Sequence, residues 1–76
     1  MESQFLQDFL GYCYKNGEGV EQDYVKAVEW YIKAAEAGVA IAQFNVASFY
    51  STGTVLKKDL NKAREWLTKA ANQGYE

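Results

Sequence analysis

The chain has 76 residues, of which 49% are apolar and 16% are aromatic, so it is expected to form one small folded domain over residues 1–76, which excludes a disordered chain. Eight basic and ten acidic side chains give a net charge of −2, and the basic residues alternate with acids along the sequence. Without a basic cluster or a long apolar run, neither nucleic acid nor a membrane is expected as a partner.

The first two predicted helices cover about residues 3–16 and 24–37, where apolar side chains recur at three- and four-residue steps. Asp23 precedes the second helix and is expected to cap it, because a short carboxylate accepts hydrogen bonds from the first free backbone amides. Gly38 follows and suits the left-handed backbone position after a helix. The first half of the chain is therefore predicted to be a helix, a loop and a second helix.

The second half repeats this arrangement, with a helix predicted over residues 39–52 and another that begins after Asp59 and ends before Gly74. No segment shows the alternating pattern of a half-buried strand. The predicted fold class is therefore all-α, an α/α superhelical solenoid of two helix-loop-helix repeats with four helices.

An internal repeat supports this organisation. Shifting the chain by 36 residues, which places Trp30 on Trp66, gives 12 identities in the 40 aligned pairs, where average composition gives roughly three. The repeats cover about residues 3–38 and 39–74. Because both tryptophans recur at the same position, they are interpreted as packing residues and not as recognition aromatics.

Two further expectations concern local structure. Val55 stands where the first repeat has Gly19, and a β-branched residue rarely adopts a positive φ, so the two loops are expected to differ in backbone conformation. On the exposed faces of the second helices, Glu29 with Lys33 and Glu65 with Lys69 have the spacing of favourable acid–base pairs.

The pattern of the first repeat is Leu10-Gly11-x-x-Tyr14-x-x-Gly17-x-Gly19-Val20-x-x-Asp23-x-x-Lys26-Ala27-x-x-Trp30-Tyr31-x-Lys33-Ala34-Ala35-x-x-Gly38. This pattern resembles the Sel-one-like repeat (SLR) family, a relative of the tetratricopeptide repeat, and the second repeat follows it closely. The resemblance implies an adaptor or scaffold that binds a protein or peptide, often on the concave side of the superhelix. A cysteine-rich branch associated with penicillin binding does not match a chain whose only cysteine is Cys13.

Candidate protein-binding residues lie on the face of the first helix of each repeat that packing leaves free. They are Asp8, Phe9, Tyr12, Asn45, Ser48 and Phe49. Aromatic side chains on such a face are common interaction anchors, but Phe9 and Tyr12 could equally cover the core or form an oligomer contact.

Catalysis and metal binding are not predicted. The chain has no histidine, and one cysteine cannot form a thiolate cluster. Asp23 and Asp59 are accounted for as helix caps, and Glu29 and Glu65 as members of exposed acid–base pairs, so no convergent catalytic carboxylate pair remains, and no cofactor is expected. Cys13 is interpreted as a small buried apolar residue.

The sequence leaves several alternatives open. The chain could be a dedicated inhibitor or immunity protein that neutralises one toxin or effector, instead of an adaptor. A single cysteine indicates a reducing, cytoplasmic setting, with a lost signal peptide as the alternative. Two repeats are few for a solenoid, so we expect either a fragment of a longer array or end-to-end self-association through Phe5, Phe9 or the last helix.

Overall fold

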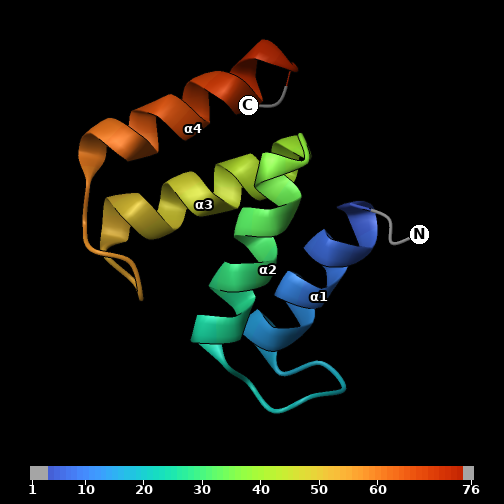
Figure 1. Cartoon of the computed structure of the whole chain (residues 1–76). Helices are drawn as coiled ribbons and strands as arrows, with labels where there is room; N and C mark the ends of the chain where they lie inside the picture. Colours follow the sequence, from blue (N-terminus) through green and yellow to red (C-terminus); the bar gives the residue numbers. More distant parts are fainter. Residues whose placement is uncertain (1–3, 75–76) are drawn as a thin grey trace.

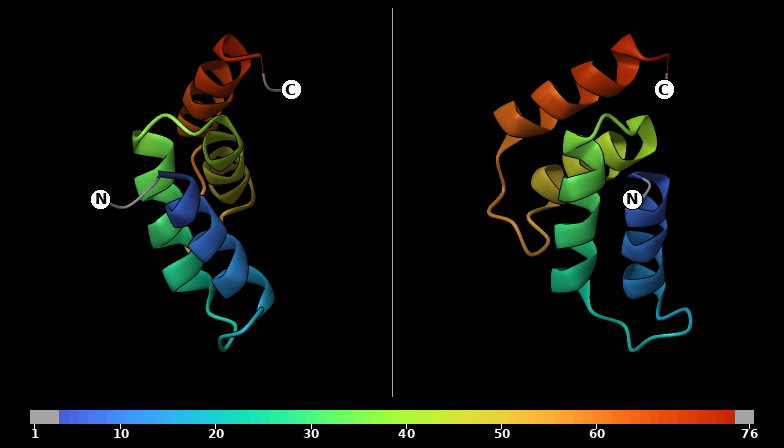
Figure 2. Two further views of the ribbon diagram at one scale, coloured as in Figure 1. Left: turned by 90° about the vertical axis from the view of Figure 1, so that its right-hand side faces the viewer. Right: turned by 45° about the vertical axis from the view of Figure 1, so that its right-hand side comes forward.

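The computed structural model describes residues 4–74, which form four α-helices and no strand (Figure 1). The helices are α1 (Gln4–Asn16), α2 (Tyr24–Glu36), α3 (Ala40–Thr52) and α4 (Leu60–Asn72). Helices α1 and α2 form one hairpin, and α3 and α4 form a second hairpin that crosses it at an angle (Figure 2). The predicted fold class is confirmed.

Both predicted N-caps are present at the start of the second helix of each hairpin. Asp23 and Asp59 have extended backbones, with φ of −154° and −152°. The Oδ1 atom of Asp23 accepts a hydrogen bond of 3.2 Å from the backbone N–H of Lys26, and that of Asp59 accepts one of 3.0 Å from Lys62. A cap of this kind contributes about 1 kcal/mol to helix stability.

The loop of the second hairpin contradicts the expectation based on Val55. Its φ is 64°, close to the 75° of Gly19 at the equivalent position in the first loop, so both residues are left-handed. The preceding loop glycines, Gly17 and Gly53, also agree, with φ of 73° and 76°. The two loops therefore share these left-handed positions, and Val55 adopts a conformation that is unfavourable for its residue type.

Hydrogen bonds at the base of each loop give the physical reason. The backbone N–H of Asp23 donates to the carbonyl of Tyr14 at 2.8 Å, and that of Asp59 donates to the carbonyl of Tyr50 at 3.0 Å. These bonds hold the ends of two seven-residue connections in the same place, so the loop geometry is imposed by the hairpin. Packing of the hairpin offsets the local strain at Val55.

Between the hairpins, the chain turns at Gly38, whose φ of 99° confirms the predicted left-handed position. Gln43 is buried just after this turn. Its Nε2 donates to the carbonyl of Ala35 at 3.2 Å, and its Oε1 accepts from Nε2 of Gln73 at 2.9 Å. This side chain therefore links α3 to the last turn of α2 and to the end of α4.

The hydrophobic core lies mainly between α2 and α3. Val28 and Val46 are fully buried at its centre, and small side chains from both helices allow the backbones to approach closely. The rings of Tyr31 and Phe49 meet with their centroids 5.9 Å apart. A Cβ atom added to Gly11 of α1 would lie 3.0 Å from the Tyr31 ring, so this glycine makes room for the aromatic side chain.

The two tryptophans are half-buried, and Trp66 packs against the core, in agreement with a packing role. The predicted acid–base pairs are not formed in the described part of the chain. Instead, Nζ of Lys33 lies 4.7 Å from the centroid of the Trp30 ring, and Nζ of Lys69 lies 4.5 Å from that of Trp66. A cation over an indole ring at the surface gains about 0.5–1 kcal/mol, comparable to or better than an exposed ion pair.

The face of α2 that includes Ala35 is covered by α3. The equivalent face of α4, which includes Ala71, has no helix of the described residues packed on it. Ala35 of α2 is 1% exposed, whereas its repeat equivalent Ala71 is exposed, as are Leu60 and Leu67. In the described residues, no helix is long and apolar enough to cross a membrane.

Candidate functional site

Three side chains of α1 form a line along one face of the helix. Asp8, Tyr12 and Lys15 are separated by four and three residues, which places them one above another. Tyr12 is 48% exposed, and the other two are half-buried. Burial raises the pKa of the hydroxyl of the core residue Tyr31 to about 12, and the nearby Asp8 and Tyr12 contribute to this rise.

Asp8 is in an unusual environment for a carboxylate. Its Oδ1 atom is buried and has no hydrogen-bond partner within residues 4–74. Burial raises the pKa of the carboxyl group above its usual range. A buried carboxylate oxygen without a donor lacks the hydrogen bond that usually compensates for lost hydration, which favours the protonated form of the carboxyl group.

The predicted residues of α3 do not share one environment. Ser48 is exposed and Asn45 is half-buried on the side of α3 that faces α1. Phe49 is only 6% exposed, because its ring packs on Tyr31. The structure therefore shows Phe49 mainly as a core residue whose edge borders the surface.

Phe9 lies at the edge of the predicted set of α1 residues. It is 58% exposed, and it is the repeat equivalent of Asn45. Because Asn45 is on the side of α3 that faces α1, the repeat places Phe9 on the side of α1 that faces away from α3. Phe9 is three residues before Tyr12, so the two exposed side chains are neighbours on α1, with Phe9 on the edge farther from Asp8 and Lys15.

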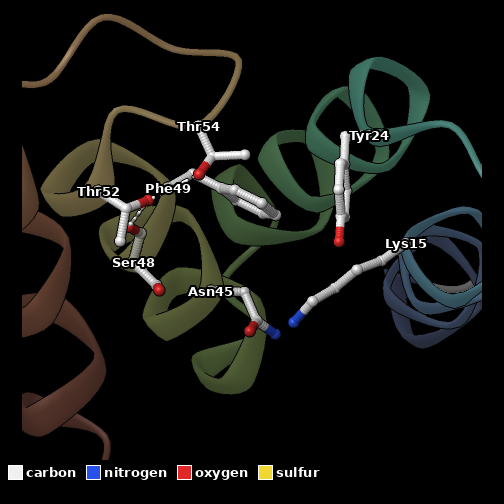
Figure 3. A pocket seen from close by; sticks show the side chains of 7 residues that line it. All are labelled: Lys15, Tyr24, Asn45, Ser48, Phe49, Thr52 and Thr54. Atoms are coloured by element: carbon white, nitrogen blue, oxygen red, sulfur yellow. Dashed lines mark hydrogen bonds between the residues drawn. The ribbon is translucent and has the colours of Figure 1, made fainter.

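A cavity of about 250 Å³ lies between the first hairpin and α3 (Figure 3). Lys15 and Tyr24 border it on one side, and residues of α3 and its following loop border it on the other. The full lining is Lys15, Tyr24, Asn45, Ser48, Phe49, Thr52 and Thr54. Asp8 and Tyr12 do not line the cavity but precede Lys15 on the same face of α1, and we call the cavity together with these two residues the α1–α3 groove.

Polar side chains are arranged in the groove in two ways. Oγ1 of Thr52 is 3.0 Å from the carbonyl of Ser48, to which it donates, and 2.9 Å from Oγ1 of Thr54, so these hydroxyls are held by internal bonds. The ammonium group of Lys15 and the side-chain amide nitrogen of Asn45 point toward each other across the cavity (Figure 3). Both are donors and cannot satisfy one another, so they leave a place for a shared acceptor.

Sequence analysis missed four of the lining residues: Lys15, Tyr24, Thr52 and Thr54. Their convergence depends on the angle at which the hairpins cross, which no local pattern specifies. For Lys15 there was a usable signal, since it lies three residues after Tyr12 and therefore on the same helical face. Tyr24, the first residue of α2, is exposed at the mouth of the groove.

A second cavity of about 170 Å³ lies between α3 and α4. It is lined by Phe44, Ala47, Ser48, Ser51 and Leu67. By the 36-residue repeat, Leu67 corresponds to Tyr31, so the smaller side chain leaves space that an aromatic ring fills in the first hairpin. Ser48 borders both cavities, so one cavity lies on each side of α3 at this residue.

Among residues 4–74, no three histidine, cysteine or acidic side chains are placed to hold a metal ion. Cys13 is buried, as predicted for a small apolar residue.

The sequence was compared with protein families, with curated proteins and with solved structures. A family model described as the Sel1 repeat matches the sequence twice, at residues 7–39 and 40–75. These units begin four residues and one residue later than the repeats predicted from the internal shift. A search of curated proteins found no match to the sequence.

Two solved structures are similar to the chain. A Sel1 repeat protein from Oxalobacter formigenes is 42% identical, with a TM-score of 0.91 over 96% of this chain. A protective antigen present in uropathogenic Escherichia coli strains, which displays an SLR fold, is 44% identical, with a TM-score of 0.88 over 93% of this chain. The matched region spans 30% of the first protein and 15% of the second.

Proposed function

Because the chain belongs to the Sel1 repeat family, whose members are generally protein-interaction modules, we propose that it binds a partner protein or peptide in the α1–α3 groove as an adaptor or scaffold. The observation that carries this proposal is the hollow between two helices of different hairpins, which Lys15 lines, with the exposed Tyr12 one turn before Lys15 on the same face of α1. Tyrosine is enriched among interface residues that contribute most to affinity, because it combines a rigid apolar ring with a polar end.

The predicted binding residues have different roles in this proposal. Tyr12, Asn45 and Ser48 form the contact surface, and Asp8 adds a charged group beside them. Phe49 supports the floor of the groove from the core. Phe9, one turn before Tyr12 on α1, is assigned to the edge of the surface, where it contacts a large partner or another copy of the chain.

Affinity purification from the native host tests the proposal. The wild-type chain is compared with Tyr12→Ala, with Phe9→Ala, and with a Val25→Ala/Leu60→Ala control that removes exposed apolar area elsewhere. We expect the control to retain the partner, Tyr12→Ala to lose it, and Phe9→Ala to have a smaller effect. Equal retention by all variants that keep the fold would contradict a site in the groove.

The identity of the captured protein distinguishes the two kinds of interaction protein. Several components of one complex, all lost with Tyr12→Ala, would establish an adaptor. A single toxin or effector, bound one to one and inactivated, would instead establish a dedicated inhibitor or immunity protein. Catalysis is not part of the proposal, because this repeat scaffold is typically non-catalytic.

Self-association end to end is a separate part of the proposal. Leu67 and Ala71 of α4 occupy the repeat positions of Tyr31 and Ala35, which α3 covers within the chain. Gln7 is the repeat equivalent of Gln43, whose amide bonds the Ala35 carbonyl. Helix α1 of a second copy could therefore stack on α4 in the same register as α3 on α2.

We also propose a cytoplasmic location. The buried, unpaired Cys13 supports it, because an unpaired thiol suits a reducing compartment. Fractionation of the host with an antibody against the chain would test this, and recovery outside the cytoplasm would contradict it.

A further inference from the structure

The α1–α3 groove contains one acidic and one basic group, at separate positions along α1. Lys15 is the only charged residue that lines the cavity, and Asp8 lies two turns before it on the same face. Seven residues of helix correspond to a rise of about 10 Å. The groove therefore has an electrostatic polarity along its length.

The environment of Lys15 suits a carboxylate. The ammonium group and the amide nitrogen of Asn45 are donors directed at the same space, and a carboxylate has two oxygens that accept from both (Figure 3). Tyr24 and Phe49 border this space with aromatic surface, against which the carbon atoms of the acidic residue would pack. Ser48 also lines this space, and its hydroxyl group is a further potential donor.

The environment of Asp8 suits a cation or a strong donor. Its Oδ1 atom is buried without a partner among the described residues, and Tyr12 beside it presents an exposed ring. Asp8 as a whole is half-buried, so a lysine or arginine side chain can lie along the Tyr12 ring and approach the part of the carboxyl group that is exposed.

We propose that the groove binds an extended peptide segment of the partner in which an acidic residue contacts Lys15 and a basic residue contacts Asp8. An extended chain rises about 3.3 Å per residue, so a span of about 10 Å separates the two residues by three positions. This inference rests on the proposed function, because it specifies the partner of the same groove.

Selection from a random octapeptide library tests the inference. One arm uses peptides with acetylated and amidated ends, so that every charge comes from a side chain, and a second arm leaves the C-terminal carboxylate free. We expect the wild-type chain to select an acidic and a basic residue three positions apart, always in the same order. Selection of the acid only as a free C-terminus would keep the inference and assign the carboxylate to the chain end.

Matched variants assign each charge to its residue. Lys15→Gln should weaken binding of the selected peptide about tenfold and remove the preference for an acid, while Asp8→Asn should remove the preference for a base. Lys57→Gln and Glu21→Gln, in the exposed loops, should bind like the wild type. Circular dichroism of each variant confirms that the fold is retained.

Three results would overturn the inference. If peptides bind and Tyr12→Ala abolishes binding, but Lys15→Gln and Asp8→Asn select the same sequences as the wild type, the charge pattern is wrong and the groove remains the site. If the selected peptides carry no paired charges, the same conclusion holds. If neither arm yields a binding peptide, peptide recognition by charge is refuted, and the purification experiment decides the proposed function separately.

Discussion

Val55 shows how a repeat can impose a backbone conformation on an unsuitable residue. Its φ of 64° matches that of Gly19 in the first loop, although a left-handed conformation costs a residue with a Cβ about 1–2 kcal/mol. No sequence pattern could reveal this, because the propensity of valine points the other way. The hydrogen bond that closes the loop, from Asp59 to the carbonyl of Tyr50, outweighs the local preference.

We therefore expect Val55→Gly to stabilise the fold by up to about 1 kcal/mol, since relief of strain exceeds the extra entropy that glycine gains in the unfolded chain. The reverse change, Gly19→Val, is the matched control. Nothing lies within 4 Å of a Cβ added at Gly19, so its destabilisation by about 1 kcal/mol would come from backbone strain alone. Urea unfolding measures both, and a destabilised Val55→Gly would contradict the assignment.

Gly11 poses a different steric problem. Alanine in place of a helical glycine gains about 1 kcal/mol of helix propensity, but its Cβ would be 3.0 Å from the ring of Tyr31. That ring is held by Phe49 and cannot move freely, so overpacking by about 1–3 kcal/mol should prevail. The second hairpin has Ala47 and Leu67 at these positions, which is the compatible pair.

A double-mutant cycle checks this explanation. Gly11→Ala should destabilise the wild-type chain but stabilise a Tyr31→Leu background, because the smaller side chain recreates the pair of the second hairpin. The free energy of unfolding is measured for all four proteins. The same sign of effect in both backgrounds would contradict the steric explanation.

The four helices have equal lengths but unequal support. Helix α2 packs against both α1 and α3, whereas α4 packs mainly against α3, and its buried residues are only Ala63 and Ala70. Its N-cap at Asp59 therefore contributes a larger share of its stability. Helices with few buried apolar contacts open at lower free energy than the rest of a domain.

Native-state hydrogen exchange should show weaker protection in α4 than in α2. Asp59→Ala should lower the protection of α4 amides by about 1 kcal/mol, because it removes the bond to the Lys62 amide, while Asp59→Asn should keep most of it. Equal loss in all four helices would instead indicate that the chain opens as one cooperative unit.

At the scale of the whole molecule, the exposed face of α4 predicts that copies of the chain associate as concentration rises. Sedimentation velocity of the wild type should show species larger than a monomer as concentration rises. Ala71→Glu should shift the equilibrium toward monomer by at least about tenfold, because it places a charge where a stacked copy would bury it, while Ala37→Glu in the exposed turn should not. A wild type that stays monomeric at high concentration and unfolds cooperatively would contradict end-to-end stacking.

The fold could be predicted from the sequence because the signals that mark its helix boundaries are local and occur in both repeats. Asp23 and Gly38 mark helix boundaries, and the internal repeat places Asp59 and Gly74 correspondingly. The groove could be predicted only in part, because Lys15 and Tyr24 come to line it through the crossing of the two hairpins. That crossing depends on small buried side chains and on the Gln43 bonds, whose geometry a linear pattern does not encode.

Occupation of the α1–α3 groove by a partner protein can be observed directly by NMR. Chemical shifts of the isotope-labelled chain are mapped with and without the partner captured from the host. We expect the largest changes at Tyr12, Asn45 and Ser48. Changes confined to the exposed residues Val25 of α2 and Leu60 of α4, with none in the groove, would contradict binding at this site.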